Sequence, residues 1–286
     1  MRYAAIQRIP SPVPIGRRCH LLGVSRSGYY AWRTRGPSRR AHGDVALVVA
    51  MRRIHAEVDR SYGSPRMHRE LVGEGMACGR HRVARVMRAA GIQAKQARRF
   101  RVTTDSRHAF AIAPNRLGRA FTVAAPNEVW MGDVTYIPTD TGWCYLAVLL
   151  DAFSRRVVGW AVGTQLTAAL PLAALETAVR TRRPPPGLLY HSDRGVQYAC
   201  EAYQRALRTH GLDGSMSRRG DRWDNAVVES FFHSLKVERL HDHRFRNVED
   251  VTTEVDDYIE RFYNRTRRHS TLGYLSPVIY ELRHAA

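Results

Sequence analysis

Long apolar runs and paired cysteines are both missing from this sequence of 286 residues. Its four cysteines include no CxxC pair, which argues against a zinc cluster or a disulfide framework and indicates reduced thiols. The longest apolar stretch, at 144–150, is far shorter than the roughly 20 residues that cross a bilayer. Prolines and arginines interrupt the N-terminus where a signal peptide requires an apolar segment. We therefore expect a soluble, cytoplasmic protein that does not enter a membrane.

Acidic residues are scarce, and their scarcity is uneven. The chain has 26 Asp and Glu against 45 Lys and Arg, a formal net charge of +19 and a pI of about 10.6. Residues 1–120 hold 25 of the basic and 6 of the acidic residues, whereas residues 121–286 hold 20 of each. Such an excess of positive charge is typical of proteins that bind nucleic acid. We expect the first 120 residues to bind DNA and the rest to have a different task.

The first part of the chain has the pattern of a basic arm followed by three helices. Residues 1–40 are rich in proline and arginine and form the expected arm. Apolar spacing then predicts helices at 44–60, with Asp44 as the N-cap, at about 66–73 and at 79–91. Turns that contain glycine separate these helices.

Three short helices of this kind, the last one rich in arginine, predict a helix-turn-helix-type DNA-binding domain at 41–102. The same pattern also fits an ordinary solvated basic helix. The basic, poorly periodic segment at 103–122 is expected to be a linker. The DNA-contact candidates on the third helix are Arg80, Arg82, Arg85 and Arg88.

From residue 123 the pattern changes to one of strands. Three apolar, β-branched runs between 127 and 163 predict a meander of antiparallel strands. The elements expected after it are a helix at 166–182, a strand ending near 193, a helix at 197–211 and a fifth strand at 213–217. This order predicts an α/β fold, with a mixed five-stranded sheet flanked by helices, over 123–245. A long helix at 248–270 and a turn-rich tail form a C-terminal helical extension over 246–286.

Three carboxylates stand at informative places in this second part. Asp133 lies within the first strand, Asp193 ends the fourth, and Glu229 follows on a helix after 35 intervening residues. Strand ends in α/β sheets commonly present site residues, and hard cations prefer carboxylate oxygen. Two divalent ions can activate an oxygen nucleophile and stabilise the charge that develops when a phosphodiester is cleaved. The three acids therefore predict a site for Mg²⁺ or Mn²⁺ that acts on a nucleic-acid backbone.

The helix that carries Glu229 has one polar face. At about 100° per residue, Asn225, Glu229 and Lys236 fall within about 40° of one another, while an apolar stripe faces elsewhere. Lys236 is placed either to contact a DNA phosphate or to offset the charge of the acids. Asn225, together with Arg218 and Arg219 of the preceding loop, completes the set of expected DNA contacts.

Other polar residues of this part are expected to have ordinary structural roles. Asp151 is a rival carboxylate for the metal site, but we expect it to fix a turn with Ser154 or Arg155. His191 is expected to pack beside the site or to support its ligands, in preference to a catalytic role. Three further acids are interpreted as solvated, as a helix cap and as a surface residue, and these are Asp221, Asp224 and Glu238. The basic group Arg265, Arg267, Arg268 and His269 fits a solvated helix end and a DNA contact equally well.

Five segments together resemble the transposases of the insertion-sequence-three family, second reading frame: WMGDVTYI, LDAFSRRVVGW, HSDRGVQY, SMSRRGDRWDNAVVESFFHSLKVE and YNRTRRHSTLGYLSP. Members of this bacterial family are DDE enzymes with a ribonuclease-H-like integrase core. The resemblance implies that Asp133, Asp193 and Glu229 are the catalytic triad and that Lys236 is its accompanying basic residue. It also implies that 44–100 is the helix-turn-helix-type segment of the family.

The resemblance further implies an activity and partners. The expected enzyme is a DNA transposase that carries out metal-dependent cleavage and strand transfer at the ends of an insertion element. Its expected partners are double-stranded DNA of the terminal repeats and of the target, further copies of itself on DNA, and an upstream-frame protein to which it is fused. Its expected place is the bacterial cytoplasm, where DNA associates it with the nucleoid.

Two other functions fit parts of the same sequence. A ribonuclease-H-like nuclease would only cleave, but the basic first part of the chain indicates a protein that holds DNA. A DNA-binding regulator with a decayed catalytic core would not need the three acids. All three acids and Lys236 are present, which argues against decay.

Overall fold

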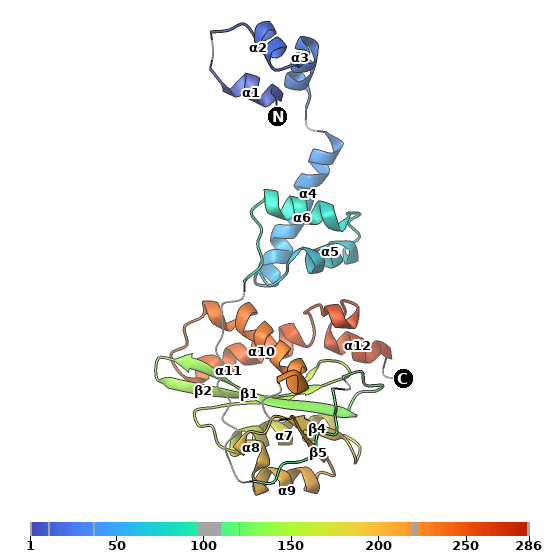
Figure 1. Ribbon diagram of the computed structural model, residues 1–286, viewed down its shortest axis with the longest axis vertical. Coiled ribbons are helices and arrows are strands. Elements are labelled where there is room, and N and C mark those ends of the chain that lie inside the picture. Colours follow the sequence, from blue (N-terminus) through green and yellow to red (C-terminus); the bar gives the residue numbers. More distant parts are fainter. Residues whose placement is uncertain are drawn as a thin grey trace.

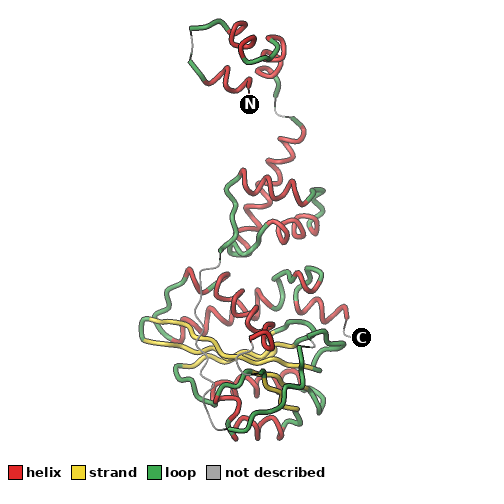
Figure 2. Tube along the Cα trace, in the orientation of Figure 1, coloured by secondary structure: helices red, strands yellow, loops and turns green. Residues whose placement is uncertain are grey.

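The computed structural model describes residues 2–10, 12–36, 38–96, 110–119, 121–218 and 222–284. These residues form two groups of helices that follow one another along the chain and then a larger α/β part (Figure 1). The strands of the described residues all lie in this last part (Figure 2). Within the same ranges, no helix combines the length and the apolar content that a membrane crossing requires.

The N-terminal group consists of α1 (Arg2–Arg8), α2 (Ile15–Leu21) and α3 (Arg26–Thr34). Each helix contributes one residue to a small core, formed by Ile6, Cys19 and Tyr29. The Ser25 side chain caps α3 by accepting a hydrogen bond from the Gly28 backbone N–H at 3.0 Å. The segment expected to be a basic arm thus contains a helical core of its own.

The second group consists of α4 (Arg39–Glu57), α5 (Ser64–Gly73) and α6 (Arg80–Ala89). These are the three helices predicted between 44 and 91. However, α4 begins earlier than predicted, because Ser38 supplies the N-cap oxygen and accepts from the Ala41 backbone N–H at 3.2 Å. The prediction that Asp44 is the N-cap is therefore wrong, and Asp44 lies inside α4.

The sheet has the order β3-β2-β1-β4-β5. Its strands are β1 (Val129–Thr139), β2 (Gly142–Asp151), β3 (Val157–Gly163), β4 (Leu189–Ser192) and β5 (Asp213–Met216). The pairs β1–β2 and β2–β3 are antiparallel, whereas β1–β4 and β4–β5 are parallel. The predicted meander and the predicted mixed five-stranded sheet are both confirmed.

Helices cover both faces of the sheet (Figure 1). One layer contains α7 (Ala169–Arg182), α8 (Val196–Ala199) and α9 (Glu201–Thr209), and the other contains α10 (Ala226–Glu238) and α11 (Val248–Asp256). In β2, Leu146 and Val148 pack into the core of the α10 layer, whereas Ala147 and Leu149 pack into that of the α7 layer. Alternation with a period of two explains this division, and burial on both faces explains the continuous apolar run. The single helix predicted at 197–211 is divided into α8 and α9.

The C-terminal extension departs from the predicted helix at 248–270. After α11 the chain forms a π-helical segment, η3 (Asp257–Tyr263), and it ends in a helix, α12 (Pro277–His284), where a turn-rich tail was expected. Asn264 follows the π-helical segment, and its side-chain amide exchanges two hydrogen bonds of 3.0 Å with the backbone of Val157. This amide joins the extension to β3. Short 3-10 turns complete the described elements: η1 (Arg222–Asn225), η2 (Leu240–Asp242) and η4 (Ser270–Leu272).

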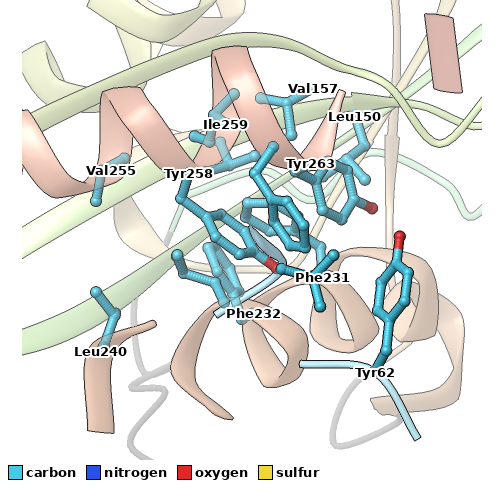
Figure 3. Close-up of a cluster of buried hydrophobic side chains, with 14 of the residues drawn as sticks. Tyr62, Leu150, Val157, Phe231, Phe232, Leu240, Val255, Tyr258, Ile259 and Tyr263 are labelled. Carbon is cyan, nitrogen blue, oxygen red and sulfur yellow. The ribbon is translucent and has the colours of Figure 1, made fainter. Parts of the chain in front are cut away.

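The helix-turn-helix-type group is docked on the α10 layer. Arg268 of the extension forms an ion pair with Glu70 of α5, and its backbone N–H donates to the Tyr62 hydroxyl at 3.0 Å. Tyr62 is fully buried and lies near the aromatic cluster around Phe231 (Figure 3). Apolar residues of α4, α5 and α6 belong to the same core cluster as those of α10 and α11. The two parts therefore share one core.

Candidate active site

The sheet register brings Asp133 and Asp193 together. The parallel pairing of β1 with β4 ends at Met131 opposite His191. Asp133 and Asp193 each lie two residues beyond this last pair, so strand alternation directs both to the same side of the sheet. A side chain in place of Gly132 would collide with the Tyr190 hydroxyl, so glycine leaves room for the buried Tyr190 side chain next to Asp133.

Backbone amides orient both aspartates. The Val134 N–H donates to the Asp133 carboxylate at 2.8 Å, and the Gly195 N–H donates to the Asp193 carboxylate at 2.9 Å. Both side chains are half-buried. Each carboxylate is therefore held by its own local backbone and still reaches solvent, as an acid that must receive a cation and a substrate requires.

Helix α10 supplies the third carboxylate. Glu229 lies in its first turn and is exposed. The helix is fixed to the sheet beside Asp133, because the Asn225 amide donates to the Gly132 carbonyl oxygen at 3.2 Å. Val228 and Phe231 are buried on the sheet side of the same turn. These contacts bring the first turn of α10, which carries Glu229, close to Asp133.

The pKa of Asp133 reflects its burial and the nearby charges of Asp193 and Glu229. Burial raises the pKa of the Asp133 carboxyl well above its usual range, and the neighbouring charges of Asp193 and Glu229 raise it further. The Val134 N–H and the Lys236 ammonium act in the opposite direction. The three acids thus share one electrostatic site, although in the described part of the chain no three Asp, Glu, His or Cys side chains form a closed set of metal ligands.

Lys236 lies inside this site and not on an open surface. Its residue is only 8 % exposed, and burial lowers the pKa of its ammonium group to about 8, while the nearby Asp133 acts to raise it. The predicted face shared by Glu229 and Lys236 is thus present, with the cation near the acids. Both interpretations of Lys236, as a phosphate contact and as a charge that offsets the acids, fit this place.

The surroundings of Asn225 differ from those predicted. It was expected to face DNA, but it is buried and its amide bonds to Gly132. The reason is that Asn225 precedes the first turn of α10, at the point where the helix meets β1. It is therefore a positioning residue in this structure, and a DNA contact from this interior place is not proposed.

The arginines expected to contact DNA fall into two groups. Arg80 and Arg88 are exposed on α6. Arg82 and Arg85, in contrast, form ion pairs with Asp44 of α4 at 2.8 and 2.6 Å, and these pairs lower the pKa of the Asp44 carboxyl.

An arginine of the loop before α10 also forms ion-pair contacts within the fold. Arg218 is bonded to the buried Asp224, with its Nη2 at 2.9 Å from the carboxylate. The hydrogen bonds from Arg218 lower the pKa of Asp224, and Arg119 forms a second ion pair with it at 3.0 Å. Arg219 lies outside the described residues, as does Asp221.

Two structural roles expected from the sequence are confirmed. Asp151 is fully buried and fixes the β2–β3 turn by accepting hydrogen bonds from the backbone N–H groups of Phe153 and Ser154. His191 is buried between the hydroxyls of Ser215 and Ser217, at 2.9 and 3.1 Å.

The expectation that Glu238 is a surface residue is wrong. It is buried at the end of α10, where Arg267 bonds to both of its oxygens at 2.6 and 2.7 Å and the Tyr258 hydroxyl donates at 2.9 Å. Neither interpretation of the basic group at 265–269 holds for Arg267 and His269, since both are buried. No local pattern indicated this, because the partners come from separate elements that only the fold brings together.

Family models match most of the chain. An HTH-like domain matches residues 43–100, and integrase core domain models match residues 123–222 and 210–277. The chain is 43% identical over 262 residues to an uncharacterized 31 kDa protein of insertion element IS600 from Shigella sonnei, covering 92% of this chain and 96% of that protein. It is 41% identical over 292 residues to the transposase InsF for insertion sequence IS3A of Escherichia coli (strain K12), covering 100% of both.

Solved structures resemble the chain more distantly. A simian T-cell lymphotropic virus intasome, solved in complex with a PP2A regulatory subunit, matches with a TM-score of 0.47 and 14% identity, over 80% of this chain and 73% of that one. The HTLV-2 integrase catalytic core domain, solved in complex with magnesium, matches with a TM-score of 0.43 and 17% identity, over 55% of this chain and 97% of that one.

Proposed function

We propose, because the chain belongs to the insertion-sequence-three (IS3) family of transposases, that Asp133, Asp193 and Glu229 are the catalytic carboxylates of this enzyme. The chain is a DDE-type DNA transposase, a transferase of polynucleotide strands with an integrase core and an HTH-like domain. The observation that supports the residue assignment is the arrangement of β1, β4 and α10: the sheet register aligns Asp133 with Asp193, and the Asn225 amide fixes the start of α10 beside Asp133. Acids from two strands and one helix thereby meet at one place.

The cofactor proposed for this site is Mg²⁺ or Mn²⁺. Integrase core enzymes depend on a divalent metal, and the residues present fit one. Three carboxylates offer the hard oxygen ligands that these ions prefer, and a cation would offset both the burial of Asp133 and the charges of Asp193 and Glu229 that raise its pKa. When bound, the ion would activate the attacking oxygen and stabilise the charge that develops at the phosphorus.

The residues of the chain have their own tasks in this proposal. Asp133, Asp193 and Glu229 hold the cation, and the amides of Val134 and Gly195 keep the two aspartates in orientation. Asn225 fixes the first turn of α10 to β1 and so sets the position of Glu229. Such support matters because a displacement of about 1 Å can cost about a hundredfold in rate.

The reaction we propose has two steps of the same type. In the first, water attacks the phosphorus at the end of the element, the bond to the 3′ oxygen breaks, and a 3′-hydroxyl is released. In the second, this hydroxyl attacks a phosphorus of the target DNA and displaces the 3′ oxygen of the target strand. Lys236, buried beside Asp133, is proposed to meet a phosphate of the bound strand.

The proposed partners are double-stranded DNA of the element ends and of the target, and further copies of this chain assembled on that DNA. The exposed Arg80 and Arg88 of α6 are the proposed DNA contacts of the HTH-like domain. A protein of the upstream frame, fused to this one, is the proposed source of further end recognition. Through its DNA the enzyme is proposed to associate with the bacterial nucleoid.

A strand-transfer assay tests the function and the residues together. A labelled terminal-repeat duplex is incubated with the enzyme, target DNA and Mg²⁺, and both the nicked and the joined products are measured. We expect both products from the natural chain and neither from Asp133→Asn, Asp193→Asn or Glu229→Gln, while all three variants still bind DNA. Near-natural cleavage by any one variant would remove that residue from the triad.

The same assay separates the two alternative functions. A nuclease that only cleaves would give the nicked product without the joined one. A regulator with a decayed core would give neither product from the natural chain, although it would bind the duplex.

A further inference from the structure

A second polar pocket lies on a different face of α10 from Glu229. It has a volume of about 230 Å³ and opens to solvent. The side chains of Phe231 and Tyr263, packed edge to face at 4.8 Å, form an apolar wall (Figure 3). The polar lining consists of Arg155, Ser230, Ser234, Arg267, His269 and Thr271.

Positive charge is in excess around this pocket. Arg267 and Arg66 both reach Glu238, at 2.6 and 3.3 Å, so that one carboxylate serves two guanidinium groups. Among the described residues, no hydrogen bond or ion pair engages the side chain of Arg155. Burial lowers the pKa of the Arg155 guanidinium, although the nearby Tyr263 and Asp151 act to raise it.

The pKa of His269 also indicates a positive electrostatic potential in this pocket. Burial lowers the pKa of its imidazole, and the charges of Arg267, Arg66 and Arg155 lower it further. The charge of Asp151 acts on Arg155, but the Asp151 carboxylate also accepts hydrogen bonds from the backbone N–H groups of Asn127, Phe153 and Ser154. An anion entering the pocket would therefore meet three guanidinium groups, those of Arg155, Arg267 and Arg66, against the two carboxylates of Glu238 and Asp151.

Arg155 lies in the turn between β2 and β3, which holds its backbone. It has a left-handed backbone with φ of 63° in the β2–β3 turn, and its N–H donates to the Asp151 carbonyl oxygen at 2.8 Å. Asp151, which fixes this turn, is fully buried. The turn therefore fixes the backbone position from which the Arg155 side chain extends into the pocket.

We propose that this pocket binds a backbone phosphate of duplex DNA, separate from the phosphate that reacts at Asp133. The identity of the ligand rests on the proposed function, whereas the pocket and its charge do not. A guanidinium fork with neighbouring hydroxyl donors matches the oxygens of a phosphate. Ser230 follows Glu229 directly on α10, so a phosphate seated here would fix the duplex relative to the catalytic acids.

The test measures binding of a short duplex to the full chain without divalent metal, over a range of potassium chloride concentrations. Arg155→Gln should weaken binding about five- to tenfold at about 0.1 M salt and reduce the salt slope by about one unit. Arg155→Lys should retain most of the affinity, because it keeps the charge. Neither substitution adds backbone strain, since arginine already lacks the freedom of glycine at this φ.

The matched control is Arg180→Gln, which removes the same charge from an exposed position on α7, in the opposite layer. Equal effects of Arg155→Gln and Arg180→Gln would overturn the proposal. If circular dichroism shows that Arg155→Gln does not fold, the test uses Ser230→Asp with Ser230→Asn as its control. Ser230→Asp should weaken duplex binding more, because it places a negative charge at the pocket. Equal binding by these two serine variants would also overturn it.

Inorganic phosphate distinguishes DNA from a small ligand. It should raise the melting temperature of the natural chain more than that of Arg155→Gln. Equal shifts would overturn the anion pocket, and a shift that depends on Arg155 without any effect on duplex affinity would overturn DNA as the ligand. Because no arm measures cleavage, an inactive natural chain would contradict the proposed function alone.

Discussion

The two ends of α10 carry glutamates with opposite surroundings. Glu229, in the first turn, is exposed and shares its site with Asp133 and Asp193, two groups of its own sign. Glu238, at the last residue, is 6% exposed and is bonded by Arg267 and by the Tyr258 hydroxyl. One carboxylate adds to an excess of negative charge, and the other neutralises buried positive charge.

This difference teaches that the role of an acid is set by what faces it across the fold. A buried ion pair with complete hydrogen bonds holds neighbouring elements together, and removing one partner leaves a costly buried charge. Crowded acids do the reverse, because they store unfavourable energy that a cation relieves, and such groups cluster at functional sites. The sequence of α10 alone does not separate these two cases.

The largest expected effect on stability would come from removing the ion pair between Glu238 and Arg267 at the end of α10. Glu238→Gln should lower the free energy of unfolding by about 3–5 kcal/mol, because Arg267 stays buried without its anion. Glu229→Gln, the matched control on the same helix, should leave stability unchanged or slightly higher. Urea denaturation of both variants measures this.

A double variant sharpens the same test. Replacing Arg267 by Met in the Glu238→Gln chain removes the uncompensated charge and should restore part of the lost stability. If Glu238→Gln unfolds at the same urea concentration as Glu229→Gln, then the ion pair does not hold α10 to the extension and the comparison fails.

A smaller effect is expected from metal at the end of α10 that carries Glu229. Mg²⁺ at about a hundred times its Kd should stabilise the natural chain by about 2.7 kcal/mol, since it binds the folded site. The shift in melting temperature should disappear in Asp133→Asn and Glu229→Gln and persist in Glu238→Gln. A shift that survives in the first two variants would place the metal at some other site.

The smallest effects concern the arginines of α6, in which Arg80 and Arg88 are exposed and Arg82 and Arg85 form ion pairs with Asp44. Arg80→Ala and Arg88→Ala should each reduce the salt slope of duplex binding by about one unit. Arg82→Ala and Arg85→Ala should change it less, because Asp44 already neutralises their charge. Gel-shift titrations at several salt concentrations measure the slopes, and equal slopes for all four variants would contradict this division.

Much of the fold followed from local pattern. Apolar alternation located the strands of the meander, and helical spacing located α5, α6, α7 and α10, because burial imposes these periods on any segment that packs on one face. Helix starts were less certain, since α4 is capped by Ser38 and not by Asp44. The final helix α12 was missed because it was interpreted as part of a turn-rich tail.

The sequence by itself determined which residues we propose for the chemistry: the acids at 133, 193 and 229, the lysine at 236, and the basic first part of the chain. Only the tertiary structure decided which charges remain available for a ligand. Arg268 and Glu70, 198 positions apart, form an ion pair across two parts of the chain, and Arg267 reaches Glu238 over 29 positions. Such pairing leaves no local signal, because a charged residue has the same letter whether it faces solvent, a partner or a substrate. Its role depends on the dielectric and the charges that folding places around it.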